Sequence, residues 1–107
     1  MKPSPDLVRG ALEPVILEVI AGGATYGYEI AKAIEQTSGG HLLAQEGTLY
    51  PLLSKLRREG LVDYQWRESD AGPPRKYYSL TAKGRAHLGE LDAYWKHINK
   101  TISQLGR

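Results

Sequence analysis

The chain has 107 residues, 41% of them hydrophobic and 24% charged, a composition typical of one globular domain with a modest core. It contains no cysteine, which excludes disulfides and thiolate metal sites. It also has neither a long apolar run nor the apolar core of a signal peptide, so we expect a cytoplasmic protein without a membrane span. A net charge of +2 permits nucleic-acid binding but does not by itself argue for it.

Apolar residues in adjacent pairs at helical spacing predict a long first helix. Ser4 is suited to cap this helix, with Pro5 in its first position, and the glycine pair at 22–23 is suited to end it. Pro14 lies inside the helix and has no backbone N–H to donate, so we expect a kink or a restart there.

Two further helices follow in the first half of the chain. One is expected to have Thr25 as its N-cap and to end near Thr37. The next runs from about Glu46 to Glu59, with Gly60 at its end. Its apolar residues recur at helical spacing and are expected to face the core: Leu49, Leu52, Leu53 and Leu56. Its outer face then presents Thr48, Pro51, Lys55 and Arg58, flanked by Tyr50, Ser54 and Arg57.

A two-stranded ribbon and a last helix complete the chain. Residues 61–67 alternate between apolar and polar, which predicts a half-buried strand with one apolar face: Val62, Tyr64 and Trp66. Residues 68–74 are rich in Gly, Pro, Asp and Ser and predict a turn, and residues 75–80 predict the returning strand. Thr81 is suited to cap a helix that extends almost to the C-terminus.

This order of elements is that of a winged helix-turn-helix, a mainly α fold with a small β-hairpin (α+β). It has three helices, a two-stranded ribbon that we call the wing, and a long C-terminal helix. We expect residues 1–80 to form the winged helix-turn-helix and residues 81–107 to form a C-terminal dimerisation helix, both within one compact unit.

The third predicted helix has the features of a DNA-recognition helix. Hydroxyl groups lie near its N-terminus, where such helices contact base edges in the major groove, and cations follow, which suits phosphate contacts. The alternative is a solvated helix face, because exposed Lys and Arg are the norm.

The wing strengthens the DNA-binding interpretation. Arg75 and Lys76 follow directly on the turn, and Arg67 lies opposite on the first strand. Three cations near one loop are suited to follow a phosphate backbone or to enter a minor groove. The alternative is a hairpin whose charges discourage edge pairing.

The last predicted helix carries a heptad seam, with apolar residues at steps of 3, 4, 3, 4 and 3. Its members are Leu88, Leu91, Trp95, Ile98, Ile102 and Leu105. The first helix is placed to cover part of this stripe, and a second copy related by twofold symmetry covers the rest. A dimer of this kind places two recognition helices about 34 Å apart, which is one turn of DNA.

Several motifs in this order resemble the PadR family of bacterial transcriptional repressors, in its short form with one C-terminal helix. They are residues 26–30 (Tyr-Gly-Tyr-Glu-Ile), 47–53 (Gly-Thr-Leu-Tyr-Pro-Leu-Leu), 59–61 (Glu-Gly-Leu) and 72–78 (Gly-Pro-Pro-Arg-Lys-Tyr-Tyr). The resemblance implies a homodimer that binds a pseudo-palindromic operator. It implies DNA contacts from Tyr28, Lys32, Thr48, Tyr50, Ser54, Lys55 and Lys76. At least one of Tyr77 and Tyr78 is expected to be a buried aromatic that supports the wing.

The chain is similar in particular to multidrug-sensing PadR-type repressors, in which a tryptophan at the place of Trp95 stacks on flat drugs between subunits. Two interpretations of Trp95 stay open: the core of a dimer interface, or a contact to a planar hydrophobic ligand. Those sensors have an acidic residue one turn later, which pairs with cationic drugs, and this chain has Asn99 there. The resemblance therefore leaves room for a flat neutral ligand and does not imply a preference for cationic ones. The expected further walls are Leu7, Ala11 and Val15.

Enzyme interpretations find little support in the sequence. There is no glycine-rich phosphate loop, and the histidines at 41, 87 and 97 lack metal-ligand spacing, so we expect no catalytic residue, metal or cofactor. The remaining alternative to a DNA-binding repressor is a winged-helix module that binds another protein and does not bind DNA. The near-neutral charge and the apolar seam motivate this alternative.

Overall fold

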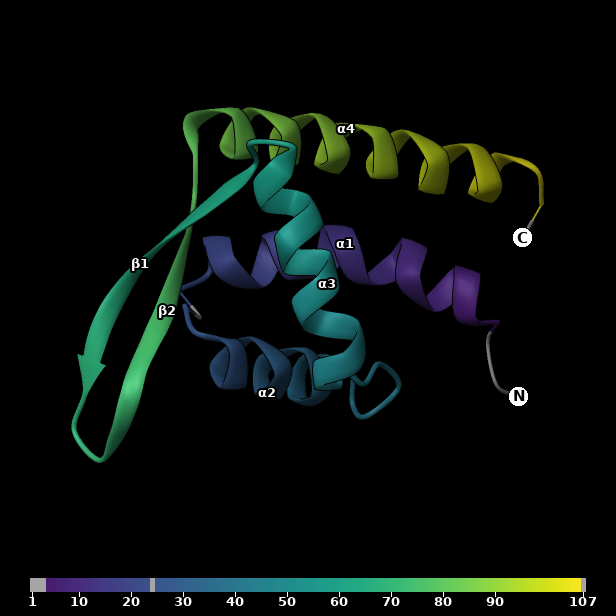
Figure 1. The fold of residues 1–107 in the computed structure, drawn as a ribbon. Coiled ribbons are helices and arrows are strands. Elements are labelled where there is room, and N and C mark those ends of the chain that lie inside the picture. The colour runs from purple at the N-terminus through teal and green to yellow at the C-terminus, as the bar shows by residue number, and fades with distance from the viewer. Residues whose placement is uncertain (1–3, 24, 107) are drawn as a thin grey trace.

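The computed structural model describes residues 4–23 and 25–106, with the backbone alone for residues 5–9. In this part of the chain four helices and one antiparallel pair of strands follow in the predicted order (Figure 1). They are α1 (Pro5–Ala21), α2 (Gly27–Thr37), α3 (Glu46–Arg58), β1 (Val62–Ser69), β2 (Gly72–Leu80) and α4 (Ala82–Gln104). The mainly α winged helix-turn-helix with a small hairpin is therefore confirmed.

The hydrophobic core lies where α1, α2 and α3 meet, and the base of the wing and the start of α4 close it. The four leucines predicted for the inner face of α3 are each at most 8% exposed, so that prediction is confirmed. They pack with residues of the other elements: Leu12, Ile16, Leu17, Ile30, Ile34, Val62 and Leu88. Burial of this apolar surface fixes the orientation of α3 and leaves its opposite face on the outside.

Helix α1 continues through Pro14, so of the two expected outcomes, a kink or a restart, the restart does not occur. A proline in a helix interior costs about 3 kcal/mol, because it removes one hydrogen bond and its ring crowds the preceding turn. Leu12 precedes this point and Ile16 and Leu17 follow it, and all three are almost fully buried. Their packing holds both halves of α1 against the core and offsets that cost.

The predicted start of α2 is wrong by one residue, because its N-cap is Tyr26 and not Thr25. The carbonyl oxygen of Thr25 accepts a hydrogen bond of 2.7 Å from the N–H of Tyr78, and Tyr26 forms a bridge to Tyr77. The backbone at Thr25 and Tyr26 thus extends along β2, and the helix begins only afterwards. Glu29 then reaches back and accepts hydrogen bonds from the N–H and the hydroxyl of Thr25.

The turn of the wing is shorter than predicted, because β1 continues to Ser69 and β2 begins at Gly72. Pro73 and Pro74 therefore lie in a strand. Successive N–H groups of a strand point alternately toward and away from the partner strand, so only one of the two prolines can face a free edge. The other is tolerated because the pairing is irregular at this point. The hydroxyl of Ser69 donates to the carbonyl of Pro73 at 2.8 Å, and the register shifts between Arg67 and Ser69.

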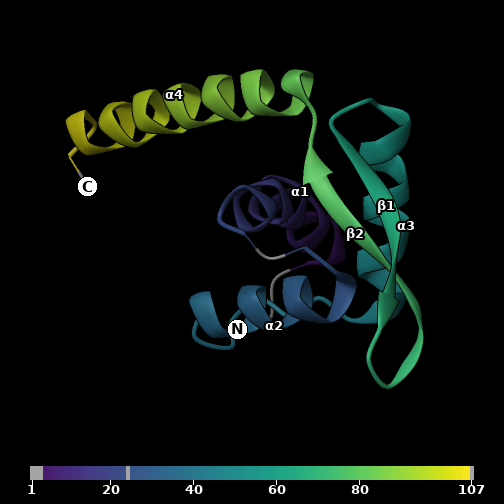
Figure 2. The ribbon, with the colours of Figure 1, turned by 90° about the vertical axis from the view of Figure 1, so that its left-hand side faces the viewer.

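Helix α4 starts at the predicted cap and then leaves the body of the molecule. The hydroxyl of Thr81 accepts from the N–H of Gly84 at 2.9 Å, which confirms Thr81 as the N-cap. The first half of α4 packs along α1, and its C-terminal half projects beyond the other elements (Figure 2). Among the described residues, no helix combines the length and apolar character needed to cross a bilayer.

Candidate nucleic-acid interface

Most of the predicted DNA-contacting residues meet in two hollows beside the outer face of α3. One hollow, of about 680 Å³, lies between the start of α2, α3 and the wing. Four of the predicted DNA-contacting residues line it: Tyr28, Tyr50, Arg75 and Lys76. The other, of about 400 Å³, lies between α3 and the wing. Three of the predicted DNA-contacting residues line it: Ser54, Arg58 and Lys76. Lys76 belongs to both, so the wing and α3 form one continuous surface.

Tyr50 is held against the start of α2. A Cβ atom added to Gly27 would lie 2.5 Å from the hydroxyl oxygen of Tyr50 and 2.9 Å from a ring carbon. The ring therefore occupies space that only glycine leaves free, although 44% of the residue remains exposed. The ring of Tyr50 on α3 therefore packs closely against the first turn of α2. This contact could not be predicted from the local sequence around either residue.

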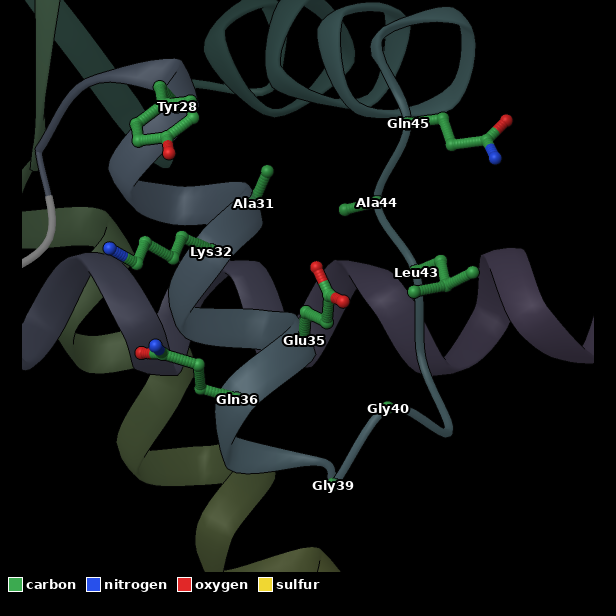
Figure 3. Close-up of a pocket in the computed structure, with 10 residues that line it drawn as sticks. All are labelled: Tyr28, Ala31, Lys32, Glu35, Gln36, Gly39, Gly40, Leu43, Ala44 and Gln45. Carbon is green, nitrogen blue, oxygen red and sulfur yellow. The ribbon is translucent and has the colours of Figure 1, made fainter.

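Tyr28 and Lys32 also line a hollow of about 690 Å³ between α2 and the loop that leads to α3. Figure 3 shows both side chains on α2, with Leu43 and Gln45 on the facing loop. Lys32 is therefore separated from the wing cations, whereas Tyr28 is shared between the two hollows. Thr48 is partly buried and Pro51 is exposed on α3.

Lys55 lies apart from the other predicted contacts. Its Nζ is 2.7 Å from Oε1 of Glu13, so it pairs with α1 on the side of α3 away from the two hollows. The hydrogen bond and charge of Glu13 raise the pKa of Lys55. A phosphate contact from Lys55 would require this ion pair to open, and its predicted role remains a prediction.

The cations of the wing are stacked on aromatic rings. Arg75 lies 4.5 Å from the ring centre of Tyr26, and Arg67 lies 5.0 Å from that of Tyr77. Cation–π contacts hold these long side chains along the ribbon while their charge stays at the surface. The cations were predictable from the sequence, but these pairings were not. The contact of Arg67 with Tyr77 crosses the ribbon, and that of Arg75 joins the wing to Tyr26 at the start of α2.

Tyr78 supports the wing from inside, as predicted for at least one of the two tyrosines. It is 6% exposed and packs with the core, and burial raises the pKa of its phenol. The predicted burial of β1 holds only at its base. Val62 is buried and Tyr64 partly so, but Trp66 is 61% exposed, because the ribbon has left the body by that point.

Some of the residues predicted to bind a ligand line a hollow of about 630 Å³ between α1 and α4. Ala11 and Val15 face Trp95 across it, whereas Asn99 is not among its lining residues. The side chain of Leu7 lies outside the described residues. Two carboxylates that the sequence analysis did not single out, Glu18 and Asp92, also line this hollow.

Glu18 and Asp92 repel each other across α1 and α4. Partial burial, followed by the nearby charge of Asp92, raises the pKa of Glu18. The folded state therefore holds the carboxyl proton of Glu18 more tightly than the unfolded state does. The contribution of this proton to the stability of the fold is present at low pH. It is lost as pH rises through the raised pKa.

Replacing Glu18 with glutamine is therefore expected to make the protein more stable than the parent at neutral pH. The difference should shrink as pH falls through the raised pKa of Glu18 and should be lost below about 4, where the parent carboxyl is protonated in the folded and the unfolded state. Urea unfolding at a series of pH values measures it. Asp92→Asn should remove the same repulsion, so equal gains that add in the double variant would contradict this account.

The heptad seam of α4 divides into a covered and an exposed half. Leu88 is 9% exposed within its own chain and belongs to the core, and Leu91 is partly buried. In contrast, Trp95, Ile102 and Leu105 are 49%, 40% and 76% exposed. The part of the seam that α1 covers is thus the N-terminal one, and Leu88 has little surface left for a partner.

Comparison with known proteins agrees with this architecture. Residues 16–90 match the transcriptional regulator PadR-like family. A PadR-like transcription factor from Bacteroides fragilis superimposes with a TM-score of 0.82 at 40% identity, covering 94% of this chain and 95% of its own.

Two curated relatives are longer than this chain. The transcriptional regulator YqjI of Escherichia coli is 35% identical over 82 residues, which are 77% of this chain and 38% of YqjI. The negative transcriptional regulator PadR of Bacillus subtilis is 26% identical over 91 residues, which are 85% of this chain and 50% of that protein. By its family match, its fold and these relatives, the chain belongs to the PadR-like family, whose members are transcriptional regulators and not enzymes.

Proposed function

We propose that this chain is a homodimeric repressor that binds a pseudo-palindromic DNA operator. Residues 1–80 form the DNA-binding part, and residues 81–107 form the dimerisation helix. The observation that carries the proposal is the continuous surface of α3 and the wing, on which Ser54, Arg58, Arg75 and Lys76 line adjoining hollows. Repression is inferred by analogy with the Bacillus subtilis relative, which is a negative transcriptional regulator.

The dimensions of DNA suit this surface. A major groove about 12 Å wide admits one helix, and α3 presents its uncovered face beside the wing (Figure 1). The wing cations then meet the flanking phosphates. Two copies joined through α4 present two such surfaces, and each reads one half of the operator.

Replacing Lys76 with alanine is expected to weaken DNA binding and to lower the slope of log affinity against log salt by about one unit, because one phosphate contact is lost. Titration of a duplex from upstream of the chain's own gene, at four salt concentrations, measures the slope. Lys100→Ala is the matched control, since Lys100 is exposed on the projecting half of α4. Equal slopes for both variants and the parent would remove Lys76 from the interface.

The same titration separates this function from a module that binds only proteins. Retardation of the duplex at low salt supports the repressor. A persistent lack of retardation with the chain's own upstream region favours the protein-binding alternative.

We further propose that a flat aromatic ligand binds between α1 and α4 and releases the DNA. Support comes from the half-exposed indole of Trp95 opposite Ala11 and Val15. Because Glu18 and Asp92 also line this hollow, an anionic ligand is disfavoured there, whatever residue stands at position 99. In a Trp66→Phe background, quenching of Trp95 fluorescence by planar aromatics tests the site. DNA release by the same compounds that persists in Trp95→Ala would refute it.

A further inference from the structure

Arg57 lies at the last turn of α3 and turns toward the wing. Its Nε donates a hydrogen bond of 3.1 Å to Oδ1 of Asp63, and its guanidinium carbon lies 4.5 Å from the ring centre of Tyr64. Both partners belong to β1. The guanidinium of Arg57 therefore joins the recognition helix to the first strand of the wing.

The acceptor of this bond is itself held in place. The same Oδ1 of Asp63 accepts the N–H of Tyr64 at 2.8 Å. That backbone hydrogen bond, followed by the one from Arg57, lowers the pKa of Asp63. The carboxylate therefore stays ionised at neutral pH and presents a fixed acceptor at the start of β1.

Tyr64 also contacts Lys76, a cation of the wing. Its ring centre lies 4.7 Å from Nζ of Lys76, and its ring packs against Tyr78 at 5.6 Å between centres. One series of contacts thus leads from α3 through Arg57 and Tyr64 to Lys76 on β2.

The covalent link between α3 and β1 is short and includes a glycine in the left-handed region, Gly60 at φ +77°. A glycine restricts the backbone less than any other residue. The angle between α3 and the wing therefore depends on contacts between side chains of α3 and side chains of β1. The bond from Arg57 to Asp63 spans that link directly. It is also exposed, since 51% of the Arg57 side chain and 63% of the Asp63 side chain are open to solvent.

We propose that Arg57 is a positioning residue that sets the orientation of the wing relative to α3 and does not itself contact DNA. This inference rests on the proposed DNA binding. Arg58, the next residue, is exposed on the same turn and is expected to contact phosphate. The two neighbouring arginines therefore have different roles.

The direction in which Asp63→Asn changes the affinity for DNA tests this proposal. Removing a negative charge close to DNA strengthens binding on electrostatic grounds alone. The neutral oxygen of asparagine is a weaker acceptor for the Arg57 guanidinium than a carboxylate, so the bond that positions the wing is weakened and we expect affinity to fall about threefold. Asp70→Asn, which removes an equal charge at the tip of the wing, is the control and should not weaken binding. An Asp63→Asn variant that binds as tightly as the parent, or more tightly, overturns the proposal.

The salt dependence of DNA binding separates the two arginines. Arg58→Met should lower the slope by about one unit, as expected for a lost phosphate contact. Arg57→Met should lower the affinity and leave the slope unchanged, and its effect should vanish in a Lys76→Ala background. A reduced slope for Arg57→Met, or effects that simply add with Lys76→Ala, would make Arg57 an ordinary phosphate contact and refute the inference.

These variants alter exposed residues, apart from Lys76, which is half-buried on the ribbon. Far-ultraviolet circular dichroism and the mass in solution should therefore match the parent. Failure of the inference is distinguishable from failure of the proposed function. If the parent protein retards no DNA, the function fails. If the parent binds and Lys76→Ala lowers the slope while Asp63→Asn strengthens binding, the inference alone fails.

Discussion

Gly84→Ala is expected to destabilise the protein by about 3 kcal/mol or more. Gly84 lies in the first turn of α4, against the backbone that connects α3 to β1. A Cβ atom at this position would overlap the carbonyl oxygen of Leu61 and lie 2.9 Å from the carbonyl carbon. A flexible side chain could rotate away from such a contact, but a backbone carbonyl cannot.

The surrounding hydrogen bonds explain why the two segments do not separate to make room. The N–H of Thr81 donates to the carbonyl of Leu61 at 3.1 Å, and the hydroxyl of Thr81 donates to the carbonyl of Gly60 at 2.6 Å. Moving α4 outward to accept a methyl group breaks these bonds and exposes Leu88 beneath the helix.

Gly89→Ala provides the matched control for Gly84→Ala. It lies in the same helix, and a Cβ atom there would meet nothing within 4 Å. Alanine should therefore stabilise the protein by about 0.5–1 kcal/mol through its higher helix propensity. Urea unfolding of both variants measures the difference. Comparable stability of Gly84→Ala and Gly89→Ala would show that α4 is not docked this closely.

If the proposed dimer forms through α4, Ile102→Glu is expected to make the protein monomeric and to lower affinity for a two-half-site duplex by at least about 100-fold. Ile102 lies on the exposed half of the seam, where two copies of α4 would bury it. A carboxylate in that contact costs more than an exposed one, because it loses its hydration without gaining a partner. A monomer then binds each half-site separately and loses the gain of about 10²–10⁴ that linked sites provide.

Ser103→Glu adds the same charge one residue later, outside the seam, and should leave both the mass in solution and the DNA affinity close to the parent values. Sedimentation equilibrium and titration of the intact and half-site duplexes measure these effects. If Ile102→Glu remains a dimer, the subunits associate through another surface. If it is a monomer with undiminished affinity, the protein does not use two half-sites together.

Local sequence patterns were sufficient to predict the order of elements and most of their limits. The spacing of the α3 leucines determined its inner face, Thr81 determined the start of α4, and the alternation after Gly60 determined the wing. These features depend on residues a few positions apart, for which helix and strand geometry leaves few choices. Other signals failed. Pairing with the distant strand β2 moved the cap from Thr25 to Tyr26, and extension of the hairpin ladder to Ser69 and Gly72 shortened the turn. Packing carried α1 through Pro14, and projection of the ribbon left Trp66 exposed.

The detailed arrangement of the interface depends on contacts between residues far apart in the chain. The sequence alone determined that α3 and the wing carry cations and tyrosines, and that α4 bears an apolar stripe. Only the tertiary structure placed Lys55 against Glu13, Tyr50 over Gly27 and Arg57 between Asp63 and Tyr64. The spacing of residues along a helix defines its faces, but packing against other elements decides which side chains are engaged within the fold and which remain available to a partner.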